Sequence, residues 1–243
     1  MGLEMWLIGL GMVAIAGFTR GFSGFGSAMI LAPSLSLLFN PQQVVATVIL
    51  LEITAGIGLV PEAIAKIQWP EVLPLVLGAI VMVPLGAYSL VLAEPNLIRR
   101  IIGGLILIMA LLLNSGKLHY HQSYLGLTLA VGGLSGFLMG LAGIGGPPVV
   151  LYEMSGDNSA VTNRANLIVF FALTQSIALG LYGASGLLSI TVFQRFAAFV
   201  PVFVGCLLLG RSSFNRVDER LFRRFVYGLL LVAGGLALVM PAT

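Results

Sequence analysis

Eight long apolar segments, separated by short polar ones, are the feature that most constrains this chain. A bilayer core about 30 Å thick needs about 20 apolar residues per helix. A transmembrane β-barrel would instead show alternating segments of about ten residues. Only 9% of the 243 residues are charged and 58% are hydrophobic, whereas soluble domains carry roughly 25% charged residues. The sequence therefore predicts an all-α polytopic membrane protein with eight transmembrane helices. The segments lie near residues 5–39, 43–64, 70–92, 97–114, 122–151, 163–183, 188–210 and 221–240.

The first and fifth segments are too long for one straight span, and a glycine-rich stretch interrupts each. These stretches are GFTRGFSGFGSAMILAP at 17–33 and GFLMGLAGIGGPPV at 136–149. Pro147 and Pro148 lack a backbone N–H and disfavour helix in the residue before them. We therefore expect a half-helix to begin at one of these prolines, and Ser27 to cap another half-helix that starts near Ala28. Close helix packing is the alternative use of glycine. It accounts for the scattered Gly9, Gly56, Gly78, Gly132 and Gly133 better than for the two clusters.

The two halves of the sequence resemble each other. An offset of 119 places the four glycines of 17–26 on those of 136–145, and Phe18 on Phe137. An offset of 124 places Gly86 on Gly210 and the Arg99-Arg100 pair on Arg223-Arg224. Internal repeats are typical of transporters, whose substrate site lies where the repeats meet. We expect a four-helix repeat over 1–114, another over 122–243, and an outer loop at 115–121.

Arginine and lysine positions predict the topology through the positive-inside rule. Eight full spans place Arg99, Arg100 and the arginines of 211–224 on the cytoplasmic side, and both termini outside. This arrangement makes the repeats parallel. A re-entrant hairpin in each half is the alternative, which would leave three spans per half and invert the repeat.

Helix breaks in lipid must bury their unpaired backbone in protein or around a watery cavity. The free N–H groups at a half-helix start, together with the helix dipole, form an anion site. We expect the two breaks to face each other across one central cavity. The candidate substrate-binding residues there are Ser23, Gly24, Gly26, Ser27, Gly143, Gly145 and Gly146.

Ionisable residues inside a membrane are functional candidates by default. Arg20 lies in the first break region, where its forked donors suit an oxyanion; the alternative is an arginine that snorkels to the interface. Arg164 either lines the substrate path or is a topology-setting residue. Glu52 has no basic neighbour in sequence, and such a buried carboxylate stays protonated. We expect Glu52 to be a proton-coupling group, a partner for Arg20, or a neutral acid bonded to backbone.

Three polar residues complete the set of candidate ligands. Thr47 and Asn166 occupy matching repeat positions, and Gln175 lies beside the helical stripe that contains Asn166. Each is a candidate substrate ligand, with interhelical hydrogen bonding as the alternative.

Other functional classes find little support. His119 and His121 are expected in a solvated loop, and Glu153 is expected in a loop too. Cys206 alone gives no disulfide framework. We found no Walker A lysine motif, HExxH or serine–histidine arrangement, so we expect no cofactor, no metal, no enzymatic activity and no nucleic-acid partner.

The glycine-rich motifs at 17–33 and 136–152, followed by NRAN at 163–166, resemble those of the sulfite exporter TauE/SafE family, also called the four-toluene-sulfonate uptake family. The similarity covers almost the whole chain. It implies a membrane carrier for small sulfur-containing anions such as sulfite, thiosulfate or organosulfonates. The match is looser at Phe25 and Ser27, where the family often has glycine. An arginine–alanine pair such as Arg164-Ala165 resembles a family feature.

Together these features predict a secondary transporter in the cell membrane that works by alternating access, with proton coupling as one option. Its partners would be a small anion and the bilayer, and the sequence leaves a homo-oligomer open. An anion channel, or an assembly subunit without carrier activity, is the alternative.

Overall fold

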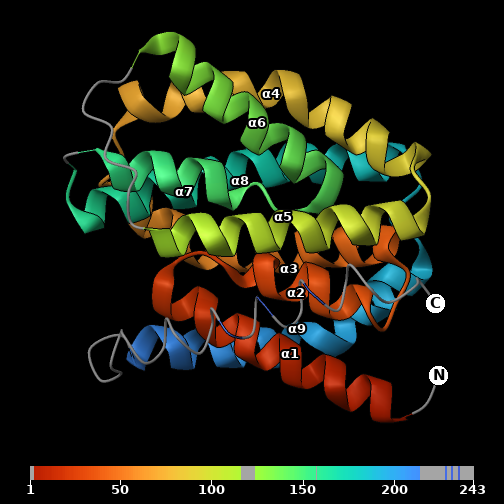
Figure 1. The fold of residues 1–243 in the computed structure, drawn as a ribbon. Coiled ribbons are helices and arrows are strands. Elements are labelled where there is room, and N and C mark those ends of the chain that lie inside the picture. The colour runs from red at the N-terminus through yellow and green to blue at the C-terminus, as the bar shows by residue number, and fades with distance from the viewer. Residues whose placement is uncertain are drawn as a thin grey trace.

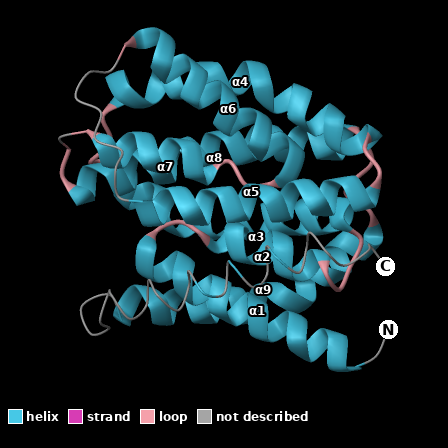
Figure 2. Cartoon of the chain, in the orientation of Figure 1, coloured by secondary structure: helices cyan, strands magenta, loops and turns pink. Residues whose placement is uncertain are grey.

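The computed structural model describes residues 3–115, 124–156 and 158–213, together with positions 228, 231 and 235. These residues form helices and no strands (Figures 1 and 2). The helices are α1 Leu3–Ser23, α2 Ser27–Ser36, α3 Pro41–Ile64, α4 Trp69–Leu92, α5 Pro95–Ser115, α6 Leu125–Ala142, α7 Gly146–Ser155, α8 Ala160–Ala184 and α9 Ile190–Ser213. Three of the predictions concern residues outside the described ones: the histidine loop, the arginines after Arg211, and the full extent of the last apolar segment.

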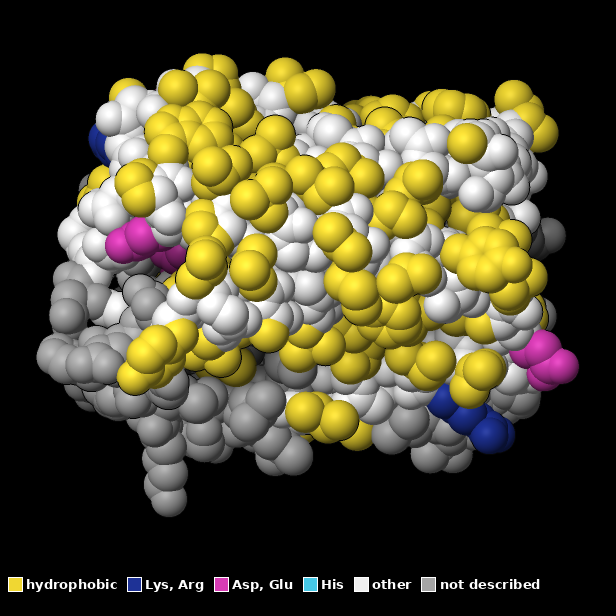
Figure 3. All heavy atoms as spheres, turned by 90° about the horizontal axis from the view of Figure 1, so that it is seen from above, with side chains coloured by type: hydrophobic (Ala, Val, Ile, Leu, Met, Phe, Trp, Pro, Cys, Tyr) yellow, Lys and Arg dark blue, Asp and Glu magenta, His cyan; other side chains and the backbone are white. Residues whose placement is uncertain are grey.

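Six of these helices, α1, α3, α4, α6, α8 and α9, are long and apolar enough to cross a membrane. Large apolar side chains are exposed along them, for example Leu77 and Val81 on α4. Figure 3 shows apolar side chains spread over one face of the molecule, with charged ones toward its two sides. The all-helical, multi-pass character of the chain is thus confirmed. The number of eight spans remains a prediction.

The long helices begin where the sequence has strong start signals. Asn40 caps α3, because its side-chain oxygen accepts a hydrogen bond from the backbone N–H of Gln42 at 3.1 Å. Ser159 caps α8 in the same way through the N–H of Thr162. Proline occupies the first turns of α3 and α4, where its missing N–H costs nothing.

The two short helices fold back along the helices that precede them. Trp6, near the start of α1, packs on Phe39, just past the end of α2, with ring centroids 5.8 Å apart. Likewise Thr128, in the first turn of α6, shares a 2.7 Å hydrogen bond with Tyr152 near the end of α7. The pairs α1–α2 and α6–α7 are therefore antiparallel hairpins. Figure 1 shows the same reversal of direction in both.

Each hairpin returns the chain to the end of the molecule from which it started. We call one end the Gln43 end; Gln42 there bonds to the carbonyls of Leu90 and Ala93, at the end of α4. We call the other the Glu71 end, where Asn158 and Asn166 bond to Glu71.

The predicted sharing of one side by Arg99 and Arg211 is wrong. Arg99 donates to the carbonyl of Ser36 at the Gln43 end, and Arg211 pairs with Glu62 at the Glu71 end. The physical reason is that α3 runs from one end to the other: Ser36 lies just before its start, and Glu62 lies in its last turn. The alternative that we kept open, a re-entrant hairpin in each half, describes these contacts.

Glycines join the hairpins to helices of the other half. A Cβ at Gly21 of α1 would lie 1.9 Å from the carbonyl oxygen of Leu207 in α9, and a Cβ at Gly140 of α6 would lie 2.2 Å from that of Val83 in α4. The two contacts are equivalent in the repeat, because the offset of 119 relates Gly21 to Gly140 and the offset of 124 relates Val83 to Leu207. In the same way, the contact of Gly86 with Phe137 is equivalent to that of Gly210 with Phe18. The repeat seen in the sequence therefore recurs as matching contacts.

The scattered glycines divide into two groups. Gly78 and Gly132 pack against backbone in the α4–α6 contact, as the packing interpretation predicts. Gly56 has open space around it, so close packing does not explain it.

Candidate anion-binding site between two helix starts

Three glycines in the breaks have backbone conformations that other residues rarely adopt. Gly24 and Gly26 have φ values of 82° and 93°, and Gly143 has 69°. Gly24 and Gly143 are repeat equivalents, so both breaks turn at the same position. Gly145, the equivalent of Gly26, is helical with φ −85°, which makes the two breaks alike but not identical.

Both short helices begin without a side-chain cap. Gly26 is the N-cap of α2 and Gly145 that of α7, and neither makes a capping hydrogen bond. The predicted capping role of Ser27 is therefore wrong. Ser27 is the first residue of α2, and its hydroxyl donates to Glu52 instead. Uncapped helix starts present free N–H groups and the positive end of the helix dipole.

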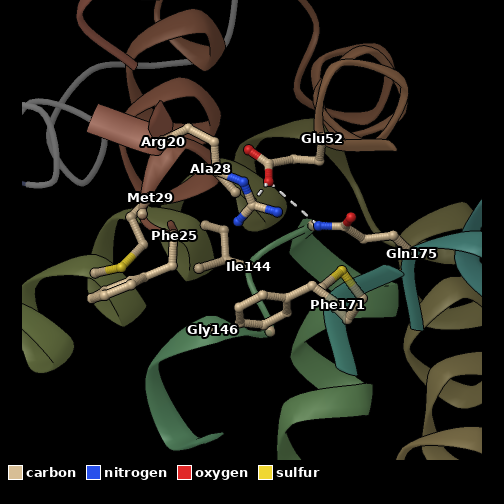
Figure 4. A pocket seen from close by; sticks show the side chains of 13 residues that line it. Arg20, Phe25, Ala28, Met29, Glu52, Ile144, Gly146, Phe171 and Gln175 are labelled. Carbon is tan, nitrogen blue, oxygen red and sulfur yellow. Dashed lines mark hydrogen bonds and ion pairs between the residues drawn. The ribbon is translucent and has the colours of Figure 1, made fainter. Parts of the chain in front are cut away.

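The two starts face one small pocket near the middle of the molecule (Figure 4). The cavity has a volume of about 20 Å³, which is little more than the space of one water molecule. The site residues that we predicted from the sequence and that line it are Arg20, Gly26, Glu52, Gly143, Gly145, Gly146 and Gln175.

Arg20 is the main positive charge at this pocket. It lies in the last turn of α1 and is only 2% exposed. Its Nη1 lies 3.4 Å from Glu52 Oε2, and its guanidinium carbon lies 5.7 Å from the centre of the Phe171 ring. Its Nε and Nη2 are buried and have no hydrogen-bond partner. Those two nitrogens form one edge of the guanidinium fork, which is the edge that binds two oxygens of an oxyanion at once.

Glu52 balances this charge from α3. It is 1% exposed and accepts hydrogen bonds from Ser27 and from Gln175 Nε2, the latter at 3.4 Å. Of the alternatives left open for Glu52, the structure shows the ion pair with Arg20. Its three partners come from α1, α2 and α8, so Glu52 ties both halves together at the pocket.

Two other candidates lie at the first break but do not line the pocket. Ser23 donates to the carbonyls of Thr19 and Phe25, at 2.7 and 2.6 Å, and so closes the turn. Arg164 packs against Gly24, where a Cβ would lie 2.8 Å from its Nε. This nitrogen is buried without a partner.

Thr47 and Asn166 lie away from the pocket. The hydroxyl of Thr47 donates to the carbonyl of Gln43 at 2.8 Å. Asn166 accepts from the N–H of Gln68 and donates to Glu71 and to Glu153, at 3.2 and 3.0 Å. The expectation that Glu153 is a loop residue is wrong, because it belongs to α7 and is 3% exposed.

Sequence reasoning missed the apolar members of the pocket. Phe25, Met29, Ile144 and Phe171 surround Arg20 and its partners (Figure 4). In a chain with this many apolar residues, no pattern distinguishes these side chains from those that face lipid. Phe25, Met29 and Ile144 lie inside the two glycine-rich stretches already singled out, whereas Phe171 lies in neither.

No group of three potential metal ligands occurs among the described residues. The polar groups of the pocket instead comprise one arginine with a free edge, two uncapped helix starts, one amide and one carboxylate. Such a set suits a small anion.

The fold and the pocket together define a multi-pass membrane protein with a buried site that contains the Arg20–Glu52 ion pair. Residues 9–237 match the model of the family described as Sulfite exporter TauE/SafE, and the chain belongs to that family.

A curated relative from Cupriavidus necator bears the name Probable sulfite/organosulfonate exporter TauE. It is 28% identical over 252 residues, an alignment that covers all of this chain and 98% of the relative. No solved structure matches the chain.

Proposed function

We propose that this protein is a secondary transporter of small sulfur oxyanions, such as sulfite or organosulfonates, in the cell membrane. The observation that supports it best is the free edge of Arg20, buried between two uncapped helix starts. Buried donors without partners cost about 1–3 kcal/mol each, so a site that keeps them free is suited to an acceptor-rich ligand. The family and the name of the relative point to the same substrates.

Glu52 would act as the counter-ion that the substrate replaces. An anion on the free edge of Arg20 competes with the carboxylate for the same positive charge. Protonation of Glu52 removes that competition, so anion binding and proton binding reinforce each other. The transporter would thereby couple a proton to each anion.

Alternating access would use the repeat. We propose two halves, residues 1–114 and 122–243, related by an inverted repeat with one hairpin and three spans in each. The matching contacts of α1 with α9 and of α4 with α6 support this division. Each hairpin packs on the other half, so rocking of the halves would open the pocket first to one end and then to the other.

Solute counterflow in liposomes tests the proposal. Purified protein is reconstituted into vesicles loaded with unlabelled sulfite, and entry of labelled sulfite, thiosulfate and methanesulfonate is measured. A carrier gives saturable uptake with transient accumulation of label, whereas a channel does not. We expect Arg20→Gln to lower the uptake at least tenfold, because no other group lining the pocket has its charge.

Arg211→Gln is the matched control, since Arg211 is exposed and paired with Glu62 at the Glu71 end. Uptake by that variant should stay near the wild-type level. Absence of uptake of all three anions by the wild-type protein would refute the proposed function. Non-saturating flux without counterflow would favour the channel alternative.

A further inference from the structure

A second buried arginine, Arg195 of α9, lies at the Gln43 end and is not explained by the central pocket. It is 3% exposed, and its Nε and Nη1 have no hydrogen-bond partner. Its Nη2 makes one long contact, 3.4 Å, with the side-chain oxygen of Gln43. Among the described residues, neither ion pair involves Arg195. A buried guanidinium without a carboxylate is costly unless something else neutralises it.

The face of this guanidinium is already occupied. Its central carbon lies 4.2 Å from the centre of the Phe39 ring, within the range of a cation–π interaction. That contact fixes the plane of the group and holds it close to α2. The N–H donors lie in the plane and remain available at its edges.

The repeat provides an internal comparison for this position. The offset of 124 relates Arg195 to Glu71, and the offset of 119 relates Phe39 to Asn158. At the Glu71 end, Asn158 donates to Glu71 at 2.6 Å. The Arg195–Phe39 contact is its counterpart at the Gln43 end. The two positions therefore correspond to each other but carry side chains of opposite charge.

The neighbours of Glu71 show what is missing around Arg195. Asn166 bridges Glu71 and Glu153, so that the acidic position is held by protein groups. The counterpart of Asn166 is Thr47, whose hydroxyl is used by the carbonyl of Gln43. The counterpart of Glu153 is Ser34, which is 3% exposed and whose hydroxyl has no partner.

We propose that Arg195, together with Ser34, forms a second oxyanion site at the Gln43 end. The transported anion would bind there transiently before or after it binds to Arg20. The unused donors of Arg195 and Ser34 would be satisfied by an acceptor-rich ligand, and none of the described protein groups bonds to them. The proposal rests on the proposed function for the class of anion. It adds a second binding position on the transport route, and the central pocket could bind an anion without it.

Thermal melting of the purified protein tests this site. Methanesulfonate is titrated against sodium chloride of equal ionic strength, because a ligand of the folded state raises the melting temperature by mass action. The wild-type protein and Arg20→Gln, Arg195→Gln and the double variant are compared. We expect Arg20→Gln to keep a sulfonate-dependent stabilisation that needs at least tenfold more ligand. The double variant should lose it.

Further variants keep the test decisive if Arg195→Gln does not fold. Arg195→Lys in the Arg20→Gln background preserves the charge and should retain part of the residual binding. Ser34→Ala in the same background should weaken it several-fold. Arg211→Gln in that background is the control and should leave it unchanged.

The outcomes separate the two proposals. Loss of all sulfonate-dependent stabilisation in Arg20→Gln alone would overturn the second site and leave the central site standing. Equal residual binding in Arg20→Gln and in the double variant would also overturn the second site. No stabilisation of the wild-type protein by sulfonate or by sulfite would reject both sites.

Discussion

At the scale of single residues, Arg20 would bind the anion, and the carboxylate of Glu52 would occupy the anion's place beside Arg20 when the site is empty. With Glu52 charged, the ion pair neutralises Arg20 from one side while the other edge stays free. A buried pair of this kind is costly to break, about 3–5 kcal/mol when one partner is removed. The substrate anion would compensate for the loss of Glu52, and this leads to a specific prediction.

Glu52→Gln should bind sulfonates at least tenfold more tightly than the wild-type protein, equivalent to about 1.4 kcal/mol. The competing charge is gone, while Ser27 and Gln175 still have an amide to contact. Calorimetry with methanesulfonate measures this, since a sulfonate keeps its charge across the accessible pH range.

Glu62→Gln is the control for this change, because Glu62 is an exposed carboxylate paired with Arg211. Its sulfonate affinity should match that of the wild-type protein. Weaker binding by Glu52→Gln would contradict the role of Glu52 as a competitor.

Asn166 has a structural role in this account. Asn166→Ala should lower the free energy of unfolding by about 3 kcal/mol, because it leaves Glu71, Glu153 and the N–H of Gln68 without a shared partner. Its sulfonate affinity should stay within twofold of wild type. Asn158→Ala removes one hydrogen bond to Glu71 and should cost only about 1 kcal/mol. Denaturant melts measure the free energy of unfolding of both variants. A large loss of sulfonate affinity in Asn166→Ala with unchanged stability would instead indicate that Asn166 binds the substrate.

At the scale of elements, glycine has two distinct uses in this chain. Gly24, Gly26 and Gly143 supply backbone conformations for the turns of the hairpins. Gly21 and Gly140 let α1 and α6 approach the backbones of α9 and α4. The motifs at 17–33 and 136–149 therefore combine a packing surface with a turn, rather than a break in a straight span.

Gly21→Ala should destabilise the protein by about 3 kcal/mol, since its Cβ would overlap the backbone of α9 and force the helices apart. Gly11→Ala, on the same helix, is the control. A Cβ there meets nothing within 4 Å, so this change should be neutral or stabilising by up to about 1 kcal/mol. Equal stability of the two variants in thermal melts would contradict the tight α1–α9 contact.

The sequence predicted the elements well and their directions less well. The glycine motifs and Pro147 mark helix boundaries, because those signals are local. The reversal of α2 along α1 depends on contacts such as Trp6 with Phe39, which no local pattern encodes. The positive-inside argument failed at Arg99, which donates to the carbonyl of Ser36 at the C-terminal end of α2.

The candidate site was predictable to a similar extent. Arg20 and Glu52 stood out because charge is rare inside apolar segments. The proximity of Gln175 to Glu52, and the distance of Asn166 from the pocket, follow from the tertiary arrangement of α8. Phe171 could not be distinguished from the other apolar residues of the chain.

At the scale of the whole molecule, the proposed inverted repeat would relate the two ends of the route to each other. Arg195 occupies at one end the position that Glu71 occupies at the other. An anion would thus meet a basic residue on one side of the central pocket and an acidic cluster on the other.

Single cysteines in a Cys206→Ala background test this topology. Glu94→Cys lies at the Gln43 end, and Ser212→Cys lies at the Glu71 end, both at exposed positions. A membrane-impermeant thiol reagent added to sealed, oriented vesicles should label one and not the other. Lys66→Cys, also at the Glu71 end, should behave like Ser212→Cys. Labelling of Glu94→Cys and Ser212→Cys from the same side would contradict the inverted repeat.

The central claim is that an oxyanion is held by Arg20 between the starts of α2 and α7. Anomalous diffraction from crystals soaked in selenite, the heavier analogue of sulfite, tests it most directly. We expect the strongest selenium peak in the central pocket, within hydrogen-bonding reach of the Nε and Nη2 of Arg20 and in front of Gly26 and Gly146. An empty pocket in crystals whose other sites bind selenium, or an unchanged peak in Arg20→Gln, would contradict the account.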